Sequence, residues 1–300
     1  MTGAVLPNTS KDIFDVRRPM PIPALTSLVT RCWTDAEKNV RQLLAKRHHD
    51  KNEDFITEVF HDELRQSFQN TSSTFAVEHA FISDLERAFP HLQHSADLKQ
   101  ITNGISVTTT LHPREIEKKT GGDLGIMFVR PNVTEQMPSQ FAIDLDYRRG
   151  LLCQAKIKRR QTAKRKARWG SFTPNQKKVL PNRLEYLALI LYEYIDAERQ
   201  HLAPFRWQLC SGTKLSDVEQ WLNSDYFPRP LMSDIIITQL GRDKIGTDDK
   251  KIIDQYICPR LRDTLVIKIG WPPGQGPEAL IRLPIKSRQR EKQYVYVYQR

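Results

Sequence analysis

Two stretches decide the fold, EKKTGGDLGIMFV at residues 117–129 and LLCQAKIK at residues 151–158. Each contains a short apolar run that follows turn-forming glycines, Gly121 and Gly122 before the first and Gly150 before the second. Apolar runs bounded by such turns predict two neighbouring β-strands. We therefore expect an α/β protein in which these strands belong to a mixed central β-sheet flanked by helices.

The second predicted strand has one apolar and one polar face, because side chains alternate along a strand. Its apolar face, formed by Leu151, Cys153, Ala155 and Ile157, can pack on a core. On the other face, the side chains of Gln154 and Lys156 point to the same small volume. Asp123 stands at the start of the first strand and reaches that volume if the two strands pair.

A carboxylate, an amide and a lysine that meet at a strand end suit metal-assisted hydrolysis of a phosphodiester. The carboxylate of Asp123 is a hard oxygen ligand for Mg²⁺, and the amide oxygen of Gln154 or the carbonyl of Ala155 supplies another. Bound Mg²⁺ polarises the phosphate and lowers the pKa of a bound water. We expect Lys156 to hold the attacking hydroxide or to stabilise charge in the transition state.

Asp123 followed by Gln154-Ala155-Lys156 resembles the PD-(D/E)XK nuclease superfamily, in the variant where glutamine replaces the acid of the last motif. The resemblance covers about residues 51–200. It implies a restriction-endonuclease-like core with extra N- and C-terminal elements. It also implies an endonuclease that cleaves DNA, with double-stranded DNA favoured, Mg²⁺ as cofactor and Mn²⁺ as its substitute. The biological setting that it implies is restriction or phage defence.

The resemblance further implies a helix before the sheet, with a glutamate that completes the metal site. An amphipathic helix is predicted from Asn52, which is a suitable cap, through Phe68. Glu53 in its first turn is the first candidate, although an acid there also favours the helix through the macrodipole. Glu78, in a second helix predicted over residues 74–89, is the rival candidate.

Two further residues are candidates close to the site. Glu117 lies six residues before Asp123, so a hairpin would bring both to one edge, whereas pairing with a neighbouring lysine is the alternative. Thr173 and Pro174 predict the start of a short helix. The resemblance implies that a helix in this place carries a glutamine facing the site, which makes Gln176 a candidate for contacting the metal ligands.

A basic segment follows the predicted lysine strand. Eight of the thirteen residues from Lys156 to Arg168 are lysine or arginine. Charges of one sign repel one another at this density unless a polyanion lies opposite. A nuclear import signal or a solvated loop has the same composition, but the position next to the site favours a phosphate-binding loop. Its candidate nucleic-acid-binding residues are Lys158, Arg159, Arg160, Lys164, Arg165, Lys166 and Arg168.

Composition agrees with a nucleic-acid partner. Lysine and arginine number 46 against 35 aspartates and glutamates, which gives a formal net charge of +11 and favours a polyanion. The four cysteines lack the paired spacing of a zinc site or disulfide framework. No apolar run approaches the ~20 residues of a membrane span, and the N-terminus does not resemble a secretory signal. We therefore expect a cytoplasmic protein with no membrane partner.

The chain is expected to divide near residue 50. Residues 1–50 predict a proline-containing arm, extended to about residue 30, and a helix over 25–46, whereas residues 51–300 predict the nuclease-like domain. Residues 130–150 read as a loop with a short strand-like run at 141–143, in which the paired acids Asp144 and Asp146 have no chemical role. Residues 184–194 read as a buried strand or buried helix. Beyond residue 201 the signals are structural, ending in a predicted edge strand at 294–298.

Two functional alternatives remain at this point. A basic nucleic-acid-binding protein without catalytic activity, built on a nuclease-like scaffold, has the same charge and pattern. A transposase-type endonuclease subunit that cuts only with partner subunits does so as well. A homodimer is compatible with either, and neither the target sequence nor the choice between DNA and RNA can be read from the residues.

Overall fold

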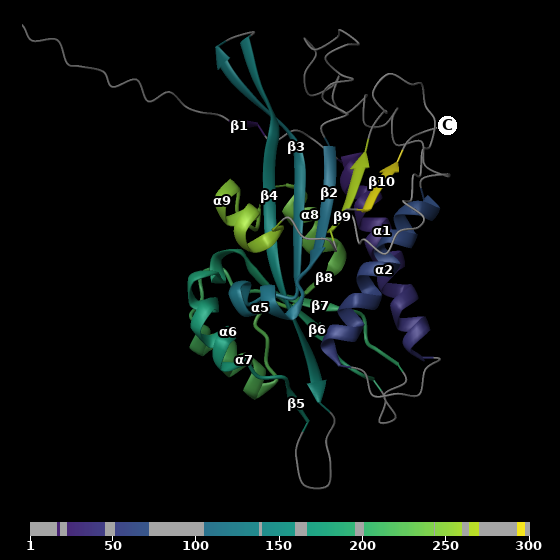
Figure 1. Ribbon diagram of the computed structural model, residues 1–300, viewed down its shortest axis with the longest axis vertical. Helices are drawn as coiled ribbons and strands as arrows, with labels where there is room; N and C mark the ends of the chain where they lie inside the picture. The colour runs from purple at the N-terminus through teal and green to yellow at the C-terminus, as the bar shows by residue number, and fades with distance from the viewer. Residues whose placement is uncertain are drawn as a thin grey trace, which may run out of the picture.

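A computed structural model describes residues 17–18, 23–45, 52–71, 105–137, 140–159, 167–195, 201–242, 244–259, 264–269 and 293–297. These residues form a mixed α/β fold in which helices flank a mixed central sheet (Figure 1). This confirms the α/β class predicted from the sequence.

The described strands form one ten-stranded sheet. Eight strands follow one another in the order β10-β9-β2-β3-β4-β6-β7-β8, while β1 pairs with β3 and β5 with β4. The pairs β4–β6 and β9–β10 are parallel and the other pairs are antiparallel. The strands are β1 Arg17–Arg18, β2 Ile105–Leu111, β3 Leu124–Met137, β4 Gln140–Arg159, β5 Arg168–Trp169, β6 Leu187–Tyr192, β7 Arg206–Leu209, β8 Leu231–Met232, β9 Thr264–Ile269 and β10 Gln293–Val297.

The helices of the described residues lie on both faces of the sheet. They are α1 Pro23–Ala45, α2 Glu53–Thr71, α5 Arg114–Thr120, α6 Pro174–Val179, α7 Leu215–Ser224, α8 Ser233–Gly241 and α9 Lys250–Ile252. Two 3₁₀-helices, η1 Leu180–Asn182 and η2 Leu184–Tyr186, precede β6, and the π-helix η3 Ile253–Ile257 continues α9. The predictions of a helix from Asn52, a buried strand within 184–194 and an edge strand near the C-terminus are confirmed.

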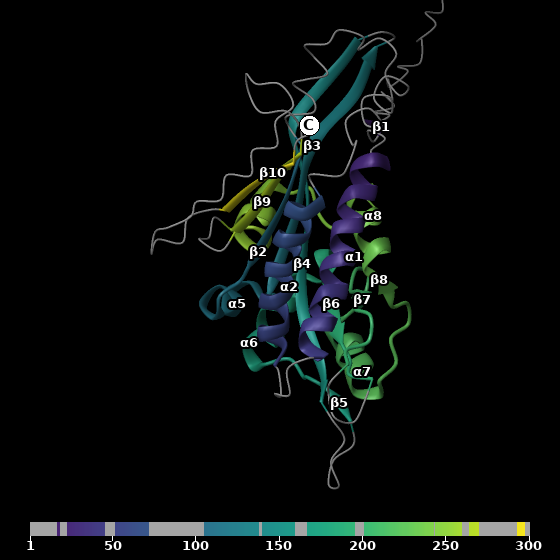
Figure 2. The same ribbon diagram turned by 90° about the vertical axis from the view of Figure 1, so that its right-hand side faces the viewer.

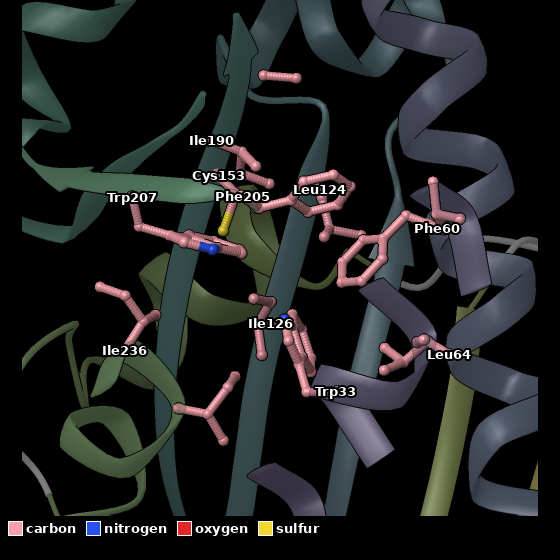
Figure 3. Packing of buried hydrophobic residues seen from close by; sticks show 14 of the residues in the cluster. Trp33, Phe60, Leu64, Leu124, Ile126, Cys153, Ile190, Phe205, Trp207 and Ile236 are labelled. Carbon is pink, nitrogen blue, oxygen red and sulfur yellow. The ribbon is translucent and has the colours of Figure 1, made fainter. Parts of the chain in front are cut away.

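Two hydrophobic clusters cover the two faces of the sheet. The first lies under α1, α2 and α8, and its aromatic centre joins Trp33 to Phe60 and Phe60 to Phe205 at centroid distances of 5.3 Å and 5.4 Å (Figure 3). The second lies under α7 and the helices η1–η3. Alternation along β4 divides its residues between the clusters, because Cys153 belongs to the first and Leu152 to the second. Because the first cluster contains residues of α1, α2 and the sheet, these elements share one core.

The loop predicted over residues 130–150 is wrong except for its strand-like run at 141–143, which lies in β4. Strands β3 and β4 continue through this region as a two-stranded ribbon that extends beyond the helices (Figures 1 and 2). Pro131 lies where the pairing shifts between Arg130 and Asn132. An irregular position tolerates a residue that cannot donate a ladder hydrogen bond, so the ribbon resumes after it.

Other predictions meet the limits of the described residues. The extended arm was expected to reach about residue 30, but α1 begins at Pro23, since proline is tolerated in the first turn of a helix. The rest of that arm, apart from Arg17 and Arg18, lies outside the described residues, as does the helix predicted over 74–89 with Glu78.

Candidate functional site

The candidate site lies where β4 runs on past the beginning of β3, in the lower half of the molecule in Figure 1. The last contact between the two strands is made by Asp123, whose N–H donates to the carbonyl of Cys153 at 2.8 Å. Beyond that point β4 keeps its parallel partner β6 on one edge, whereas the other edge has lost β3 and stays free of a strand until β5 pairs with it at Lys158 and Arg159. The backbone donors of this free edge therefore need other acceptors.

Two carboxylates take the place of the missing strand. The N–H of Ala155 donates to Asp123 Oδ2 at 2.6 Å, and the N–H of Ile157 donates to Glu53 Oε2 at 3.3 Å. Glu53 opens helix α2, and the side chain of Asn52 caps that helix by accepting from the N–H of Phe55. The fold thus places the first turn of α2 against the free edge of β4, as the prediction for Glu53 required.

Lys156 is the most deeply buried charge of the site. Its side chain is 1% exposed, and its Nζ lies 3.6 Å from Glu53 Oε1. The same Nζ lies 5.2 Å from the centre of the Phe172 ring, which covers it from the loop after β5. A buried ammonium needs opposite charge nearby, so the carboxylates of the site are what allow a lysine here.

Gln154 joins Asp123 to a second layer of polar contacts. Its amide nitrogen donates to Asp123 Oδ2 at 2.6 Å and to the carbonyl of Ala155 at 3.1 Å. Its amide oxygen accepts from the side chain of Gln176 at 3.0 Å. Of the two further metal ligands predicted beside Asp123, the amide oxygen of Gln154 or the carbonyl of Ala155, the first does not face Asp123, because the structure presents the amide nitrogen there.

Glu117 reaches the site from a helix and not from the predicted hairpin. It lies in α5, which ends at Gly121 in the left-handed conformation, with φ 79°. Its Oε1 accepts from Gln176 Nε2 at 2.9 Å, so one glutamine side chain contacts both Glu117 and Gln154. The alternative prediction, pairing of Glu117 with a neighbouring lysine, is not among the ion pairs of the described residues.

Burial and neighbouring charges raise the pKa values of two carboxyls of the site. Burial raises the pKa of the Asp123 carboxyl well above its ordinary value; Lys156 opposes this, while the charges of Glu53 and Glu117 add to it. Burial also raises the pKa of Glu117, again with Glu53 among the contributing charges. The charges of three carboxylates and one lysine thus act on one another here, and a divalent cation would favour the ionised carboxylates.

The donor atoms fit Mg²⁺ in chemical type. Asp123 Oδ2 is occupied by two hydrogen bonds, which leaves Oδ1 together with oxygens of Glu117, Glu53 and the Ala155 carbonyl. Within the described residues, no three histidine, cysteine, aspartate or glutamate side chains group closely enough to hold a metal by themselves. Mg²⁺ is usually held by only one or two carboxylates and keeps several waters, so such a group is not required.

The basic segment after β4 is described only at its two ends. Lys158 makes ion pairs with Glu193 at 2.7 Å and Asp225 at 2.6 Å, so its charge is already neutralised within the protein. Arg168, at the other end, is exposed. Arg159 belongs to β4, but its side chain is not described, and Arg160, Lys164, Arg165 and Lys166 lie outside the described residues. The prediction that Lys158 grips phosphates is therefore not supported by its contacts.

Several supporting residues were not found from the sequence. His112 donates its backbone N–H to the carbonyl of Asp123 at 2.8 Å, and its Nδ1 lies 2.9 Å from the carbonyl of Gly122. The hydroxyls of Thr57 and Tyr192 lie 3.1 Å apart, and Thr57 also bonds the carbonyl of Glu53. These contacts join residues far apart in the chain, so no local spacing predicts them.

Comparison with models of protein families and with curated protein sequences finds no match to this chain. In the part of the chain that the structure describes, none of the helices has the length and apolar character needed to cross a membrane.

Proposed function

We propose that this protein is a Mg²⁺-dependent endonuclease that hydrolyses phosphodiester bonds in DNA, with double-stranded DNA as the favoured substrate. One observation carries the proposal: Glu53, Glu117, Asp123, Gln154 and Lys156 come from separate parts of the chain and meet around the free edge of β4. A helix before the sheet and a glutamine-bearing helix after the lysine strand agree with what the resemblance to PD-(D/E)XK nucleases implies. They support a restriction-endonuclease-like core.

The residues that would hold the metal are Asp123, through Oδ1, with the Ala155 carbonyl and a carboxylate oxygen of Glu117 or Glu53. Mg²⁺ supplies polarisation of the scissile phosphate and a bound water of lowered pKa. Gln154 and the N–H of Ala155 fix the direction of the Asp123 carboxylate. This arrangement is set before any substrate binds, which is the condition under which electrostatic stabilisation is most effective.

Lys156 has the role of a fixed positive charge beside the reacting phosphate. The Phe172 ring and the β4 backbone confine its ammonium, and Glu53 sets the direction in which it points. A charge held in a site of low water content stabilises a developing anion more strongly than the same charge in solution. The charge of Lys156 also acts on Glu117, where it opposes the rise of the pKa that burial causes.

Exposed lysines on α5 and α6 provide a surface for the DNA backbone. Lys118 and Lys119 follow Glu117 on α5, and Lys178 follows Gln176 on α6. Arg183 joins the two helices, because its guanidinium donates to the carbonyls of Lys119 and Val179. Lysines next to residues of the site would bind phosphates flanking the one that is cleaved.

A second candidate function is nucleic-acid binding without cleavage. It is favoured by Gln154, whose amide nitrogen faces Asp123 and therefore withholds one oxygen ligand from a metal. Salt-dependent DNA binding without any metal-dependent cleavage would select this candidate.

The deciding experiment is nicking of supercoiled plasmid with Mg²⁺ or Mn²⁺. We expect the wild-type protein to nick and the variants Asp123→Ala and Lys156→Ala to lose activity by about 10²-fold or more. Lys177→Ala is the matched control. Lys177 is exposed and lies next to Gln176, and its own ammonium pairs with Glu219 at 2.5 Å. Cleavage at the wild-type rate by both site variants would contradict the proposal.

A further inference from the structure

A continuous chain of hydrogen bonds runs from the N-terminus of helix α6 to the carboxylate of Asp123. The backbone N–H of Thr173 donates to Gln176 Oε1 at 2.9 Å, and Gln176 Nε2 donates to Gln154 Oε1 at 3.0 Å. Gln154 Nε2 then donates to Asp123 Oδ2 at 2.6 Å. The two glutamine side chains are buried, with exposed fractions of 3% for Gln176 and 0% for Gln154.

The donor-to-acceptor direction of this series of hydrogen bonds is fixed at both ends, by groups that can act only as a donor or only as an acceptor. A backbone N–H can only donate, so Thr173 requires the oxygen of Gln176 on its side. The nitrogen of Gln176 must then face inwards, where Glu117 Oε1 accepts from it at 2.9 Å. The inward nitrogen requires the oxygen of Gln154, and the nitrogen of Gln154 is left to face Asp123.

Contacts around Asp123 suit the same direction. Asp123 Oδ2 and the Ala155 carbonyl are both acceptors, and both lie within hydrogen-bond distance of the Gln154 nitrogen, at 2.6 Å and 3.1 Å. Turning the amide over would place its oxygen against these two acceptors and its nitrogen against the donor Gln176. Three satisfied hydrogen bonds would become three unfavourable contacts in a buried place.

We propose that the capping box of α6 sets the polarity of Gln154, so that Gln154 acts as a hydrogen-bond donor that positions Asp123 and is not a metal ligand. Gln176 is then a positioning residue for both Asp123, through Gln154, and Glu117, which it contacts directly. That Gln154 is not a metal ligand rests on the proposed function, whereas the direction of the hydrogen bonds through Gln176 and Gln154 does not.

This arrangement separates the two halves of the capping box. The Thr173 hydroxyl accepts from the N–H of Gln176 at 3.2 Å and serves the helix, whereas the Thr173 N–H serves the chain to Asp123. Thr173→Ala removes the first contact and keeps the second. Gln176→Glu keeps both helix contacts, because glutamate is equally suited to this position, but it cannot donate to Gln154.

The experiment is NMR of the protein labelled with ¹⁵N in glutamine and alanine, in metal-free buffer. The side-chain NH₂ of Gln154, identified by its absence in Gln154→Glu, is expected to show an NOE to the backbone N–H of Ala155, because both donate to the same oxygen. We expect this NOE to persist in Thr173→Ala and to disappear in Gln176→Glu. Absence of the NOE in the wild-type protein would overturn the proposal, and so would its retention in Gln176→Glu or its loss in Thr173→Ala.

Addition of MgCl₂ to the same wild-type sample separates this proposal from the proposed function. If the NOE persists while the backbone N–H of Ala155 shifts, Mg²⁺ binds and Gln154 remains a donor, as proposed. If saturating Mg²⁺ abolishes the NOE, Gln154 has turned its oxygen to the metal, and its assignment as a non-ligand is wrong. If nothing shifts, the metal-dependent function fails, while the persisting NOE still supports the polarity of the chain.

Discussion

Lys156 Nζ lies 3.6 Å from Glu53 Oε1, and this contact joins the free end of β4 to the first turn of α2. The other oxygen of the same carboxylate accepts from the N–H of Ile157 at 3.3 Å. One glutamate therefore holds both the backbone of β4 and the ammonium beside it. Since the lysine is 1% exposed and the glutamate 26%, water reaches this pair only from the side of Glu53.

Lys156→Met tests whether this ammonium serves catalysis or folding. The change leaves three carboxylates near one another without their lysine, so the free energy of unfolding in metal-free buffer should fall by about 1–3 kcal/mol. Cleavage should fall by about 10²- to 10⁴-fold. The double variant Glu53→Gln, Lys156→Met removes both partners and should recover part of the stability but none of the activity. Urea unfolding and plasmid nicking measure the two effects; a folded Lys156→Met protein of normal activity would refute the assignment.

The buried carboxyls of the site also predict how stability depends on pH. Burial raises the pKa of Asp123 and of Glu117 in the folded protein. A carboxyl with a higher pKa in the folded than in the unfolded protein binds its proton more tightly when folded. It therefore stabilises the fold below its unfolded pKa of about 4, and that contribution is lost as the pH rises through the folded pKa.

We expect the free energy of unfolding in metal-free buffer to decrease from about pH 4 towards neutral pH, and Asp123→Asn to reduce this decrease. Mg²⁺ should reduce it as well, by stabilising the ionised carboxylates. Glu37 provides a control, because burial raises its pKa too, although hydrogen bonds from Ser233 and Phe205 oppose the rise. This network lies within the first hydrophobic cluster. Glu37→Gln should change the pH dependence without changing its response to Mg²⁺. Identical pH profiles of Asp123→Asn and wild type would exclude this account.

The meeting of Asp123 with Gln154 and Lys156 could be predicted because it depends on local rules. Alternation along a strand fixes which side chains share a face, and the glycine turn fixes where the neighbouring strand begins. Helix α5 was missed although its signals are present, namely Pro113 before it, acids in its first turn and Gly121 after it. Its seven residues are too few to show an apolar period, so the segment was read as part of a hairpin.

The orientation of the Gln154 amide could not be predicted from the sequence. It depends on a backbone N–H at Thr173 and on the burial of Gln176, which only the folded chain brings together. The same holds for Lys158, which belongs to a basic run in sequence but is neutralised in the fold by Glu193 and Asp225. A run of charges shows the composition of a segment, and the acids that meet it come from distant elements.

The lysines of α5 and α6 predict a salt-dependent effect on DNA binding. The triple variant Lys118→Ala, Lys119→Ala, Lys178→Ala should reduce the slope of log affinity against log salt by up to about 3, roughly one for each phosphate contact. Lys177→Ala should leave the slope nearly unchanged, because that lysine is already paired with Glu219. Fluorescence anisotropy with a DNA duplex over a range of salt concentrations measures both. Equal slopes for the triple variant and wild type would place the DNA on another surface.

Lys158→Ala should affect stability more than DNA binding. The ammonium lies 2.7 Å from Glu193 Oε1 and 2.6 Å from Asp225 Oδ2, and a phosphate would have to displace both carboxylates to reach it. We expect a loss of roughly 1 kcal/mol in the free energy of unfolding, since a partly exposed ion pair contributes little more than this. The salt slope for DNA should not change, whereas Arg168→Ala, at the exposed end of the same basic segment, should reduce it by about one.

Asp225→Asn is the matched test of the same network. Asp225 has φ 59°, a left-handed conformation that asparagine also adopts, and its Oδ1 accepts from the indole of Trp169 at 2.6 Å. The amide oxygen can keep the bond to Trp169, so the change removes only the charge that Lys158 faces. Lys158 should then be partly released, and the salt slope for DNA should rise in magnitude because one more cation meets the phosphates. If Asp225→Asn leaves the slope unchanged while Lys158→Ala lowers it, Lys158 contacts DNA directly in spite of its ion pairs.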